Sequence, residues 1–346
     1  MKIVIVFGGI SYEHEISIVS SIAMKDVLKD ELVYIFLDEH REFYHIPTDI
    51  IKSKLFSSKE YKNYDKLQIA RNGFYKKGGL FSKTKPLDFD IALTLMHGGD
   101  GEDGVIASLF EFYNIPYLAP RVEACSVSSN KFLTKGYAKE VGVNVIDYQY
   151  FTCKKDVAVQ NYPVIIKPVK LGSSIGVTIV KSQEELDYAL DVAFELDNSI
   201  IVEPFVAGIK EYNLAGTKIG NEFKFSIIEE PQKAEFLDFD KKYLDFSRTS
   251  KAKEAQLDEQ MSKKIKEAFK KIYNNIFEGS IIRCDFFVVE EEVYLNEINS
   301  IPGSMANYLF DDFNDLFKQL CLNLPKRKHI PITYEYVNKI QASKGK

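Results

Sequence analysis

Cysteine is scarce in this sequence, and so are long hydrophobic runs. Four cysteines are spread over 346 residues with no close pair, at Cys125, Cys153, Cys284 and Cys321. This spacing argues against a disulfide framework and against a structural zinc site. Near the N-terminus only five apolar residues stand together before two glycines, which is too short for a signal peptide or a membrane span. These absences predict a cytoplasmic protein.

A large excess of charge of one sign is also missing. The chain has 45 Lys and Arg against 50 Asp and Glu, a net charge of -5. Such a balance gives no broad attraction to nucleic acid or to an anionic membrane, so we expect neither partner. An anionic ligand must then be held by a local cluster of positive groups. Hydrophobic residues make up 45%, which is ordinary for a globular protein, and the length predicts two or three domains.

The order of apolar runs predicts an open α/β sheet at the start of the chain and a mixed α+β arrangement after it. Short β-branched runs are typical of buried parallel strands. They occur at 2–7, 32–37 and 91–95. A second unit begins near residue 120 and a third near 206. Ligands of open α/β sheets bind past the carboxyl ends of the strands, so the glycines after the first and third runs mark an expected site.

A segment late in the chain, IIRCDFFVVEEEVYLNEINSIPG, carries the strongest chemical signal. If its turn is centred on Glu291, Asp285 faces Glu297 across an antiparallel pair, and Arg283 faces Asn299 one pair further on. All four side chains then project from one face. Two carboxylates and an amide oxygen suit Mg²⁺, and the guanidinium beside them suits a substrate oxyanion. The alternative is a solvated face with cross-strand ion pairs, although facing carboxylates repel without a cation.

A second signal is a strand–loop–strand segment over 162–180. Its first strand delivers Lys167, and the loop then presents Gly172, Ser173 and Ser174. Glycines let backbone N–H groups approach phosphate oxygens, and the hydroxyls add donors. The context excludes a P-loop, which opens a helix, and the glycines do not match the dinucleotide-binding pattern. The alternative is a plain hairpin turn, in which Gly and Ser are common.

Four single residues are candidates for ligand contacts, each with an alternative. Lys131, in the first turn of a predicted helix, opposes the helix dipole and suits an anionic ligand, or is a solvated charge. Glu203 ends an apolar strand and suits an adenine amino group or a ribose hydroxyl, or is only a strand-end residue. Glu15 at a helix start suits a substrate ammonium group, although the dipole favours Glu there in any protein. His97 follows a strand and suits a ligand contact or a structural hydrogen bond.

In their order and spacing, these segments resemble the D-alanine–D-alanine ligases of the ATP-grasp superfamily. The resemblance runs from Gly8 to about Leu309 and rests on FGGISYEHEIS, LMHGGDGEDG, SSNKFLTK, VIIKPVKLGSSIGV, IVEPF, DFDKKYL, IRCDFFV and NEINSIPG. It implies an ATP-grasp fold, with an open parallel-sheet N-terminal domain over 1–120. Two α+β subdomains, 121–205 and 206–346, would follow and clamp ATP.

The resemblance also carries functional residues over, position by position. It implies that ATP contacts Lys131, Lys167, Gly172, Ser174, Glu203, Phe205, Val206 and Glu211. It implies that two Mg²⁺ or Mn²⁺ ions bind Asp285, Glu297 and Asn299. The implied catalytic residues are Glu15, Ser173, Tyr243, Arg283, Gly303 and Tyr308. Further substrate contacts are implied for His97, Lys242 and Leu309.

Two positions depart from the family pattern. Pro204 stands where relatives often carry a lysine in the adenine segment, so we expect an altered affinity for the nucleotide. Tyr308 stands where many relatives carry a serine near the second D-alanine. Because a phenol is much bulkier than a hydroxymethyl group, we expect an altered second subsite and a higher KM for that substrate.

The resemblance implies an ATP-dependent carbon–nitrogen ligase that makes D-alanyl-D-alanine for peptidoglycan synthesis. One D-alanine attacks ATP to give an acyl phosphate, and the amine of a second attacks that group while a mobile loop over 231–252 excludes water. A homodimer is expected for the family. The intact Lys242-Tyr243 pair and the lack of His in the loop disfavour the nearest alternative, a D-alanine–D-lactate ligase. Another ATP-grasp carboxylate–amine ligase and a non-enzymatic nucleotide-binding module are further alternatives.

Overall fold

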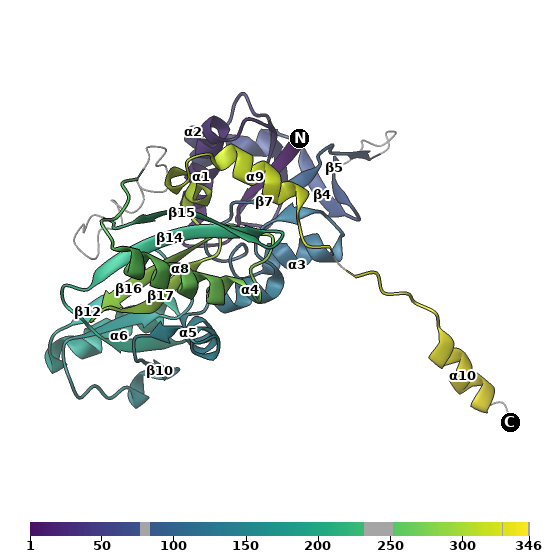
Figure 1. Cartoon of the computed structure of the whole chain (residues 1–346). Helices are drawn as coiled ribbons and strands as arrows, with labels where there is room; N and C mark the ends of the chain where they lie inside the picture. Colours follow the sequence, from purple (N-terminus) through teal and green to yellow (C-terminus); the bar gives the residue numbers. More distant parts are fainter. Residues whose placement is uncertain (77–83, 232–251, 327, 345–346) are drawn as a thin grey trace.

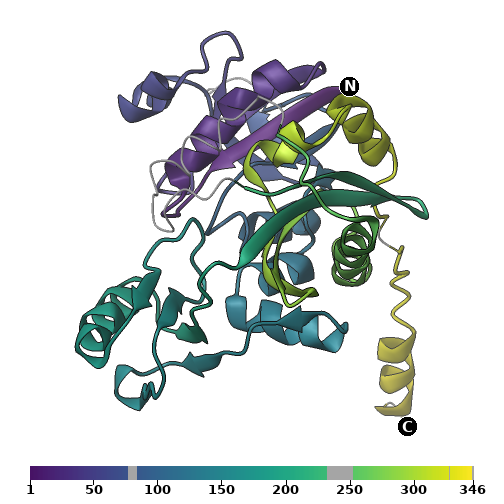
Figure 2. The same cartoon turned by 60° about the vertical axis from the view of Figure 1, so that its left-hand side comes forward.

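The computed structural model describes residues 1–76, 84–231, 252–326 and 328–344. The described chain forms three β-sheets with helices packed on them (Figure 1). In the turned view the N-terminal sheet lies at the top, with the four-stranded sheet at the lower left and the five-stranded sheet to the right (Figure 2). The predicted parallel α/β start and the mixed arrangement after it are both confirmed.

The first sheet has eight strands in the order β6-β5-β4-β3-β2-β1-β7-β8. They are β1 (Lys2–Gly8), β2 (Glu31–Leu37), β3 (Phe43–Ile46), β4 (Lys66–Ala70), β5 (Gly73–Lys76), β6 (Lys85–Pro86), β7 (Ile91–Thr94) and β8 (Tyr117–Leu118). β2, β1, β7 and β8 are parallel, and antiparallel pairing through β3 to β6 extends the sheet. Gly9 and His97 therefore lie at one edge, past the ends of β1 and β7.

Helices cover both faces of the parallel strands because the side chains of β1 are apolar on both sides. One set, represented by Ile5, packs with α1 (His14–Val27) and α9 (Phe313–Leu322). The other set, represented by Val4, packs with α3 (Val105–Phe112). Shorter helices in the first part of the chain are α2 (Ser53–Ser57), η1 (Glu60–Asn63) and α4 (Val122–Ser128).

The two smaller sheets carry the rest of the chain. The four-stranded sheet, β10-β13-β11-β12, packs against α6 (Gln183–Leu196). The five-stranded sheet, β15-β14-β16-β17-β9, packs against α5 (Lys131–Glu140) and α8 (Glu259–Tyr273). The remaining elements are β9 (Asn144–Val145), β10 (Gln149–Phe151), η2 (Lys154–Asp156), β11 (Val164–Pro168), β12 (Thr178–Val180), β13 (Ile200–Pro204), β14 (Lys210–Ile219), β15 (Glu222–Glu229), β16 (Ile282–Val289) and β17 (Glu292–Asn299).

The last part of the chain first returns to the N-terminal sheet and then leaves it. η3 (Gly303–Leu309) and α9 pack into the core that β1 and α1 share. Both views place α10 (Glu335–Lys344) away from the three sheets, at the end of an extended segment (Figures 1 and 2). Of the helices that the structure describes, none combines the length and the apolar character that a membrane crossing requires.

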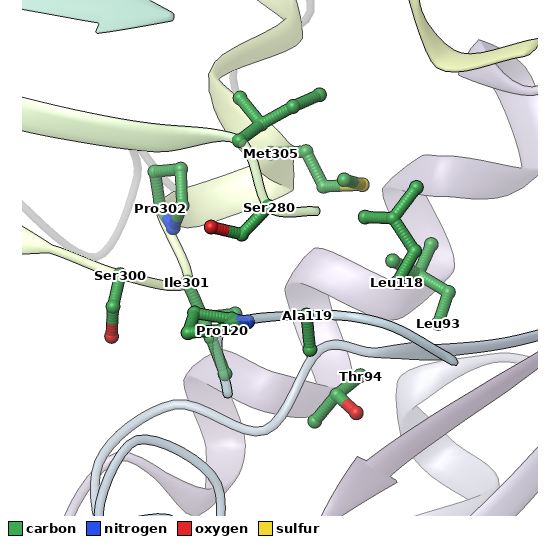
Figure 3. A pocket seen from close by; sticks show the side chains of 11 residues that line it. Leu93, Thr94, Leu118, Ala119, Pro120, Ser280, Ser300, Ile301, Pro302 and Met305 are labelled. Carbon is green, nitrogen blue, oxygen red and sulfur yellow. The ribbon is translucent and has the colours of Figure 1, made fainter. Parts of the chain in front are cut away.

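A narrow pocket marks the contact between the N-terminal sheet and η3. Figure 3 shows its lining, which combines Leu93 and Thr94 of β7 with Pro302 and Met305. Ser280 and Ala119 complete the junction between the two parts. The segment after β17 is thus held against the carboxyl ends of the parallel strands, where a ligand of an open α/β sheet is expected.

Candidate active site

The hairpin predicted to carry the metal ligands is formed by β16 and β17. Its turn is centred between Glu290 and Glu291, both with positive φ, and not on Glu291. Continued from that turn, regular pairing would put Asp285 opposite Asn296. A β-bulge shifts the register by one residue, so that Asp285 faces Glu297 as predicted. The predicted pairing is therefore confirmed, although the predicted centre of the turn was half a residue off.

Four polar side chains gather on one face of this hairpin. Arg283 donates to both carboxylate oxygens of Asp285, from Nε to Oδ1 at 2.7 Å and from Nη2 to Oδ2 at 2.8 Å. Asn299, which faces Arg283, donates from Nδ2 to Asp285 Oδ2 at 3.0 Å. Burial raises the pKa of the Asp285 carboxyl to about 6, and Arg283 acts in the opposite direction. Glu297 completes the set, so metal-type ligands and a guanidinium share one rigid element.

The chemistry of this donor set fits a divalent cation. The charge of Glu297 adds to the rise in the pKa of Asp285, which means that the two facing carboxylates repel each other. A cation between them would remove that repulsion, and carboxylate and amide oxygens are the ligands that Mg²⁺ prefers. Within the described residues, no three His, Cys, Asp or Glu side chains are grouped to hold a metal by themselves. A cation here would therefore complete its shell with other oxygens, such as those of phosphates.

Two predicted phosphate lysines lie near this hairpin. Lys131 begins α5, where Asn130 caps the helix, and its ammonium group donates to the Leu171 carbonyl. Burial lowers the pKa of Lys131, while Glu297 acts against that shift. Lys167 lies on β11 and its Nζ is 3.4 Å from Oδ1 of Asn296, the residue of the β-bulge. The structure thus brings two cations to the acidic face of the hairpin.

The glycine- and serine-rich loop joins this site to the N-terminal sheet. Ser173 and Ser174 both have positive φ, and Ile175 N donates to the Gly172 carbonyl at 3.0 Å. The Ser173 hydroxyl donates to a carboxylate oxygen of Glu13, in the loop between β1 and α1. A side chain at Gly172 would approach that carboxylate, with a Cβ 3.0 Å from Oε2. The loop is therefore more than a hairpin turn, because its contact reaches across to another sheet.

The carboxylate at this junction belongs to Glu13 and not to the predicted Glu15. Glu13 is only 7% exposed, whereas Glu15 is exposed and lines a different pocket with Phe36, Phe56 and Tyr61. Burial, followed by the charge of Glu102, raises the pKa of Glu13 to about 7. The two glutamates are close in sequence, but α1 turns Glu15 to another side. This placement favours Glu13 as the carboxylate at the junction, and the substrate contact predicted for Glu15 stays a prediction.

His97 lies beside Glu13 at the carboxyl edge of the first sheet. It is 2% exposed, and its backbone N–H donates to Ser17 Oγ of α1 at 2.8 Å. Its Nδ1 is 3.7 Å from a carboxylate oxygen of Glu102, and it also makes a hydrogen bond with the backbone of Ile301. Burial lowers the pKa of His97 to about 4, so the ring is neutral at pH 7. The histidine links the first sheet to the segment that leads into η3.

η3 holds the predicted oxyanion and second-substrate residues. Ser304, Met305 and Ala306 have left-handed backbone angles, and Ser304 N donates to Ser20 Oγ of α1 at 2.9 Å. This turn starts at the buried Gly303 and contains Tyr308. The Tyr308 hydroxyl accepts a hydrogen bond from Arg283 Nη1 at 3.4 Å. The side chain of Leu309 lies in the core with α1, so a substrate contact there falls to its backbone. The turn thus brings Tyr308 to Arg283 of the hairpin, and the catalytic roles of Gly303 and Tyr308 stay predictions.

The predicted adenine segment connects the two smaller sheets. Glu203 is buried at the end of β13, with one carboxylate oxygen 2.6 Å from Lys167 Nζ. Phe205 N donates to the Pro163 carbonyl at 3.0 Å, Val206 is partly exposed, and Glu211 lies in β14. Pro204 is exposed at the strand end. Lys242 and Tyr243 lie outside the described residues, so their roles stay predictions.

Three polar residues of this site were not predicted from the sequence. Glu102 lies near His97, Asn296 holds Lys167 from the bulge, and Lys135 contacts Glu203. Only Lys135 had a signal to find, because it follows Lys131 by one helical turn and so lies on the same helix face. Asn296 was not predicted, because regular strand pairing does not anticipate the bulge that presents it.

Known protein families match most of this chain. The family model described as D-ala D-ala ligase N-terminus matches residues 2–120, and the model described as D-ala D-ala ligase C-terminus matches 137–316. A relative from Wolinella succinogenes named D-alanine–D-alanine ligase is 56% identical, and one from Campylobacter jejuni subsp. doylei with the same name is 53% identical. Each match covers 100% of both chains.

Solved structures agree with these matches. The crystal structure of D-alanine–D-alanine ligase from Helicobacter pylori is 47% identical, with a TM-score of 0.85, and covers 95% of this chain and 100% of that one. The VanG D-Ala:D-Ser ligase of Enterococcus faecalis is 25% identical, with a TM-score of 0.72, and covers 93% of this chain and 97% of that one. The chain therefore belongs to the D-alanine–D-alanine ligase family of ATP-grasp enzymes.

Proposed function

We propose that this enzyme joins two D-alanine molecules at the expense of ATP, giving D-alanyl-D-alanine for peptidoglycan synthesis. The proposal rests on how three groups of residues are arranged in space. A hairpin face with Arg283, Asp285 and Glu297 lies close to two lysines, and the buried Glu13, hydrogen-bonded to Ser173, lies next to it. Phosphoryl transfer needs cations and metal-type ligands, acyl transfer needs an oxyanion site, and an amino acid needs a carboxylate for its ammonium group.

In the first step the ammonium group of one D-alanine binds Glu13, beside the neutral His97. A carboxylate oxygen of that D-alanine attacks the γ-phosphorus of ATP, the bond to the β–γ bridging oxygen breaks, and ADP leaves. Lys131 and Lys167 neutralise phosphate charge, and the backbone of the Gly172 loop approaches the phosphates. When bound at Asp285, Glu297 and Asn299, two Mg²⁺ or Mn²⁺ ions supply further charge neutralisation.

In the second step the amine of another D-alanine attacks the acyl phosphate carbon. A carbon–nitrogen bond forms, an oxyanion develops and the nitrogen gives up a proton to water. The bond to the phosphate oxygen then breaks, and inorganic phosphate leaves. Arg283 and the N–H of Gly303 lie at the same end of the hairpin and stabilise that oxyanion. The adenine of ATP contacts Glu203, Phe205 and Val206, and the nucleotide also contacts Ser174 and Glu211. Homodimerisation and a cytoplasmic location are proposals carried over from the family.

A coupled assay tests the function. ADP release is measured with ATP, Mg²⁺ and D-alanine, and the product is identified by mass spectrometry. We expect release that depends on D-alanine and stops on addition of EDTA. Parallel assays replace the second substrate by D-lactate or by D-serine, the latter because the fold is shared with a protein named D-Ala:D-Ser ligase. Well-folded protein that releases no ADP in response to D-alanine would exclude the ligase function, and a preference for D-lactate would favour the depsipeptide alternative.

The KM for the first D-alanine is expected to depend on pH. Glu13 binds an ammonium group only when ionised, and its pKa lies at about 7 because of burial and Glu102. The ionised fraction rises as the pH rises through this value, so KM should fall roughly tenfold from about pH 6 to about pH 8. Initial rates at saturating ATP give the profile, and Glu13→Gln serves as the control that should flatten it. A flat wild-type profile would contradict this role of Glu13.

Tyr308 is expected to weaken binding of the second D-alanine. Its phenol is buried, with its hydroxyl beside Arg283, and takes up space that a serine would leave open. We expect Tyr308→Ser to lower the KM for the second D-alanine about threefold to tenfold. Tyr308→Phe keeps the bulk and loses only the hydroxyl, so its KM should stay near the wild-type value. An unchanged KM in Tyr308→Ser would refute the steric explanation.

A further inference from the structure

Glu203, the carboxylate proposed to contact adenine, forms ion pairs with two lysines, Lys167 and Lys135. The proposed reaction gives no role to Lys135. Nζ of Lys135 lies 2.6 Å from Glu203 Oε1, and Nζ of Lys167 lies 2.6 Å from Oε2. The side chains of Lys135 and Glu203 are each 3% exposed, against 12% for Lys167. Burial acts to raise the pKa of Glu203, but the two ammonium groups outweigh it and hold this pKa below its usual value. One buried carboxylate is thus balanced by two cations.

The two lysines differ in what else surrounds them. Lys167 also contacts Asn296 of the metal hairpin, and the proposed reaction needs its charge on the phosphates of ATP. Lys135 is enclosed on α5, with Nζ 3.5 Å from the Ile146 carbonyl and 5.4 Å from the centre of the Tyr148 ring. Lys167 therefore has a second polar side chain within reach, on the metal hairpin, whereas the contacts of Lys135 hold it at Glu203.

We propose that Lys135 is a positioning residue that keeps Glu203 an ionised acceptor and thereby sets the preference for a 6-amino purine over a 6-oxo purine. This inference rests on the proposed function, in which Glu203 faces adenine. When Lys167 moves to the phosphates, Oε2 of Glu203 becomes free to accept from the adenine amino group. Lys135 then keeps its ion pair with Glu203 and continues to balance the buried negative charge.

Nucleobase selection follows from what an ionised carboxylate can do. It accepts hydrogen bonds and donates none, so it pairs with the 6-amino group of adenine and repels the 6-oxo group of hypoxanthine. Without the neighbouring cation, a buried carboxyl binds a proton because its charged form is poorly solvated. A protonated Glu203 can donate to a 6-oxo group. Loss of Lys135 should therefore weaken the binding of ATP and allow the binding of inosine triphosphate (ITP). ITP carries a 6-oxo group where ATP carries the 6-amino group.

The test compares ATP and ITP in steady-state assays with saturating D-alanine. We expect Lys135→Met to raise the KM for ATP and to lower the ATP-to-ITP ratio of kcat/KM, each about tenfold, with a much smaller change in kcat. Lys135→Arg restores a cation and should keep most of the preference. The matched control is Lys139→Met, because Lys139 lies one turn further along α5, is exposed, and contacts the same Tyr148 ring. This control should behave as the wild type.

Failure of the inference and failure of the proposed function give different results. If the wild-type protein shows no D-alanine-dependent ADP release, the proposed function itself is refuted. An active wild type with an unchanged ATP-to-ITP ratio in Lys135→Met would overturn the role of Lys135. If Lys135→Met does not fold, the double variant Lys135→Met/Glu203→Gln removes both charges together. Its amide both donates and accepts, so we expect equal use of ATP and ITP, and a wild-type ratio there would also overturn the inference.

Discussion

Replacing Arg283 by lysine is expected to lower kcat for dipeptide formation by about 100-fold or more. The guanidinium is fixed by two hydrogen bonds to Asp285, at 2.7 and 2.8 Å, and only a planar fork makes both at once. A lysine keeps the positive charge but moves it away from the place where the oxyanion develops. ADP release at saturating ATP and D-alanine measures the change, with D-alanyl-D-alanine quantified in parallel.

The control for this substitution is Arg71→Lys. Arg71 is exposed in the turn between β4 and β5, far in sequence from the hairpin, so the same chemical change there should alter kcat by less than about twofold. Melting temperatures of both variants separate a loss of chemistry from a loss of folding. A kcat within about threefold of the wild type in folded Arg283→Lys would show that the oxyanion is stabilised by other groups.

Glu13→Gln is expected to lower kcat/KM for the first D-alanine roughly 100-fold, because a charge-assisted hydrogen bond to a buried ammonium group is lost. The amide keeps the size of the side chain and can still accept from Ser173, which Glu13 contacts in the wild type. The fold around the loop should therefore persist, and the loss should fall on substrate binding. Initial rates at limiting D-alanine and saturating ATP provide the measurement.

Glu15→Gln is the matched control, because it makes the same chemical change two residues along the chain. Glu15 is exposed and lines another pocket, so we expect its kcat/KM to stay within about twofold of the wild type. A larger loss of kcat/KM in Glu15→Gln than in Glu13→Gln would show that Glu15 makes the substrate contact. The pair of variants thus decides between the sequence-based and the structure-based assignment in a single experiment.

Much of the fold follows from local patterns. The β-branched runs before Gly8 and after Asp90 predict parallel strands, because such runs are stable only when both faces are covered, and β1 and β7 confirm them. The hairpin was also predictable, since its two apolar runs flank a triplet of glutamates. The boundaries of the three predicted domains, at 120 and 205, stay predictions.

The site was predictable where one segment supplies several residues. Asp285, Glu297 and Asn299 come from a single hairpin, and strand alternation places them on one face once Asp285 is paired with Glu297. The pairing was predicted from a turn centred on Glu291, and the structure reaches the same pairing through a different turn and a bulge. That agreement was partly fortuitous, because the bulge interrupts the regular pairing and no local sequence signal predicted it.

The amino-acid sequence by itself determined the elements, the order of the motifs and the family, because periodicity, turn residues and motif spacing are local properties of the chain. Only the tertiary structure decided which glutamate reaches Ser173 and which lysines contact Glu203. Those choices depend on the direction in which α1 and α5 leave their loops and on contacts between distant segments. Burial of each charge is likewise a property of the packed chain, and it sets the pKa values on which the proposed chemistry of Glu13 and His97 depends.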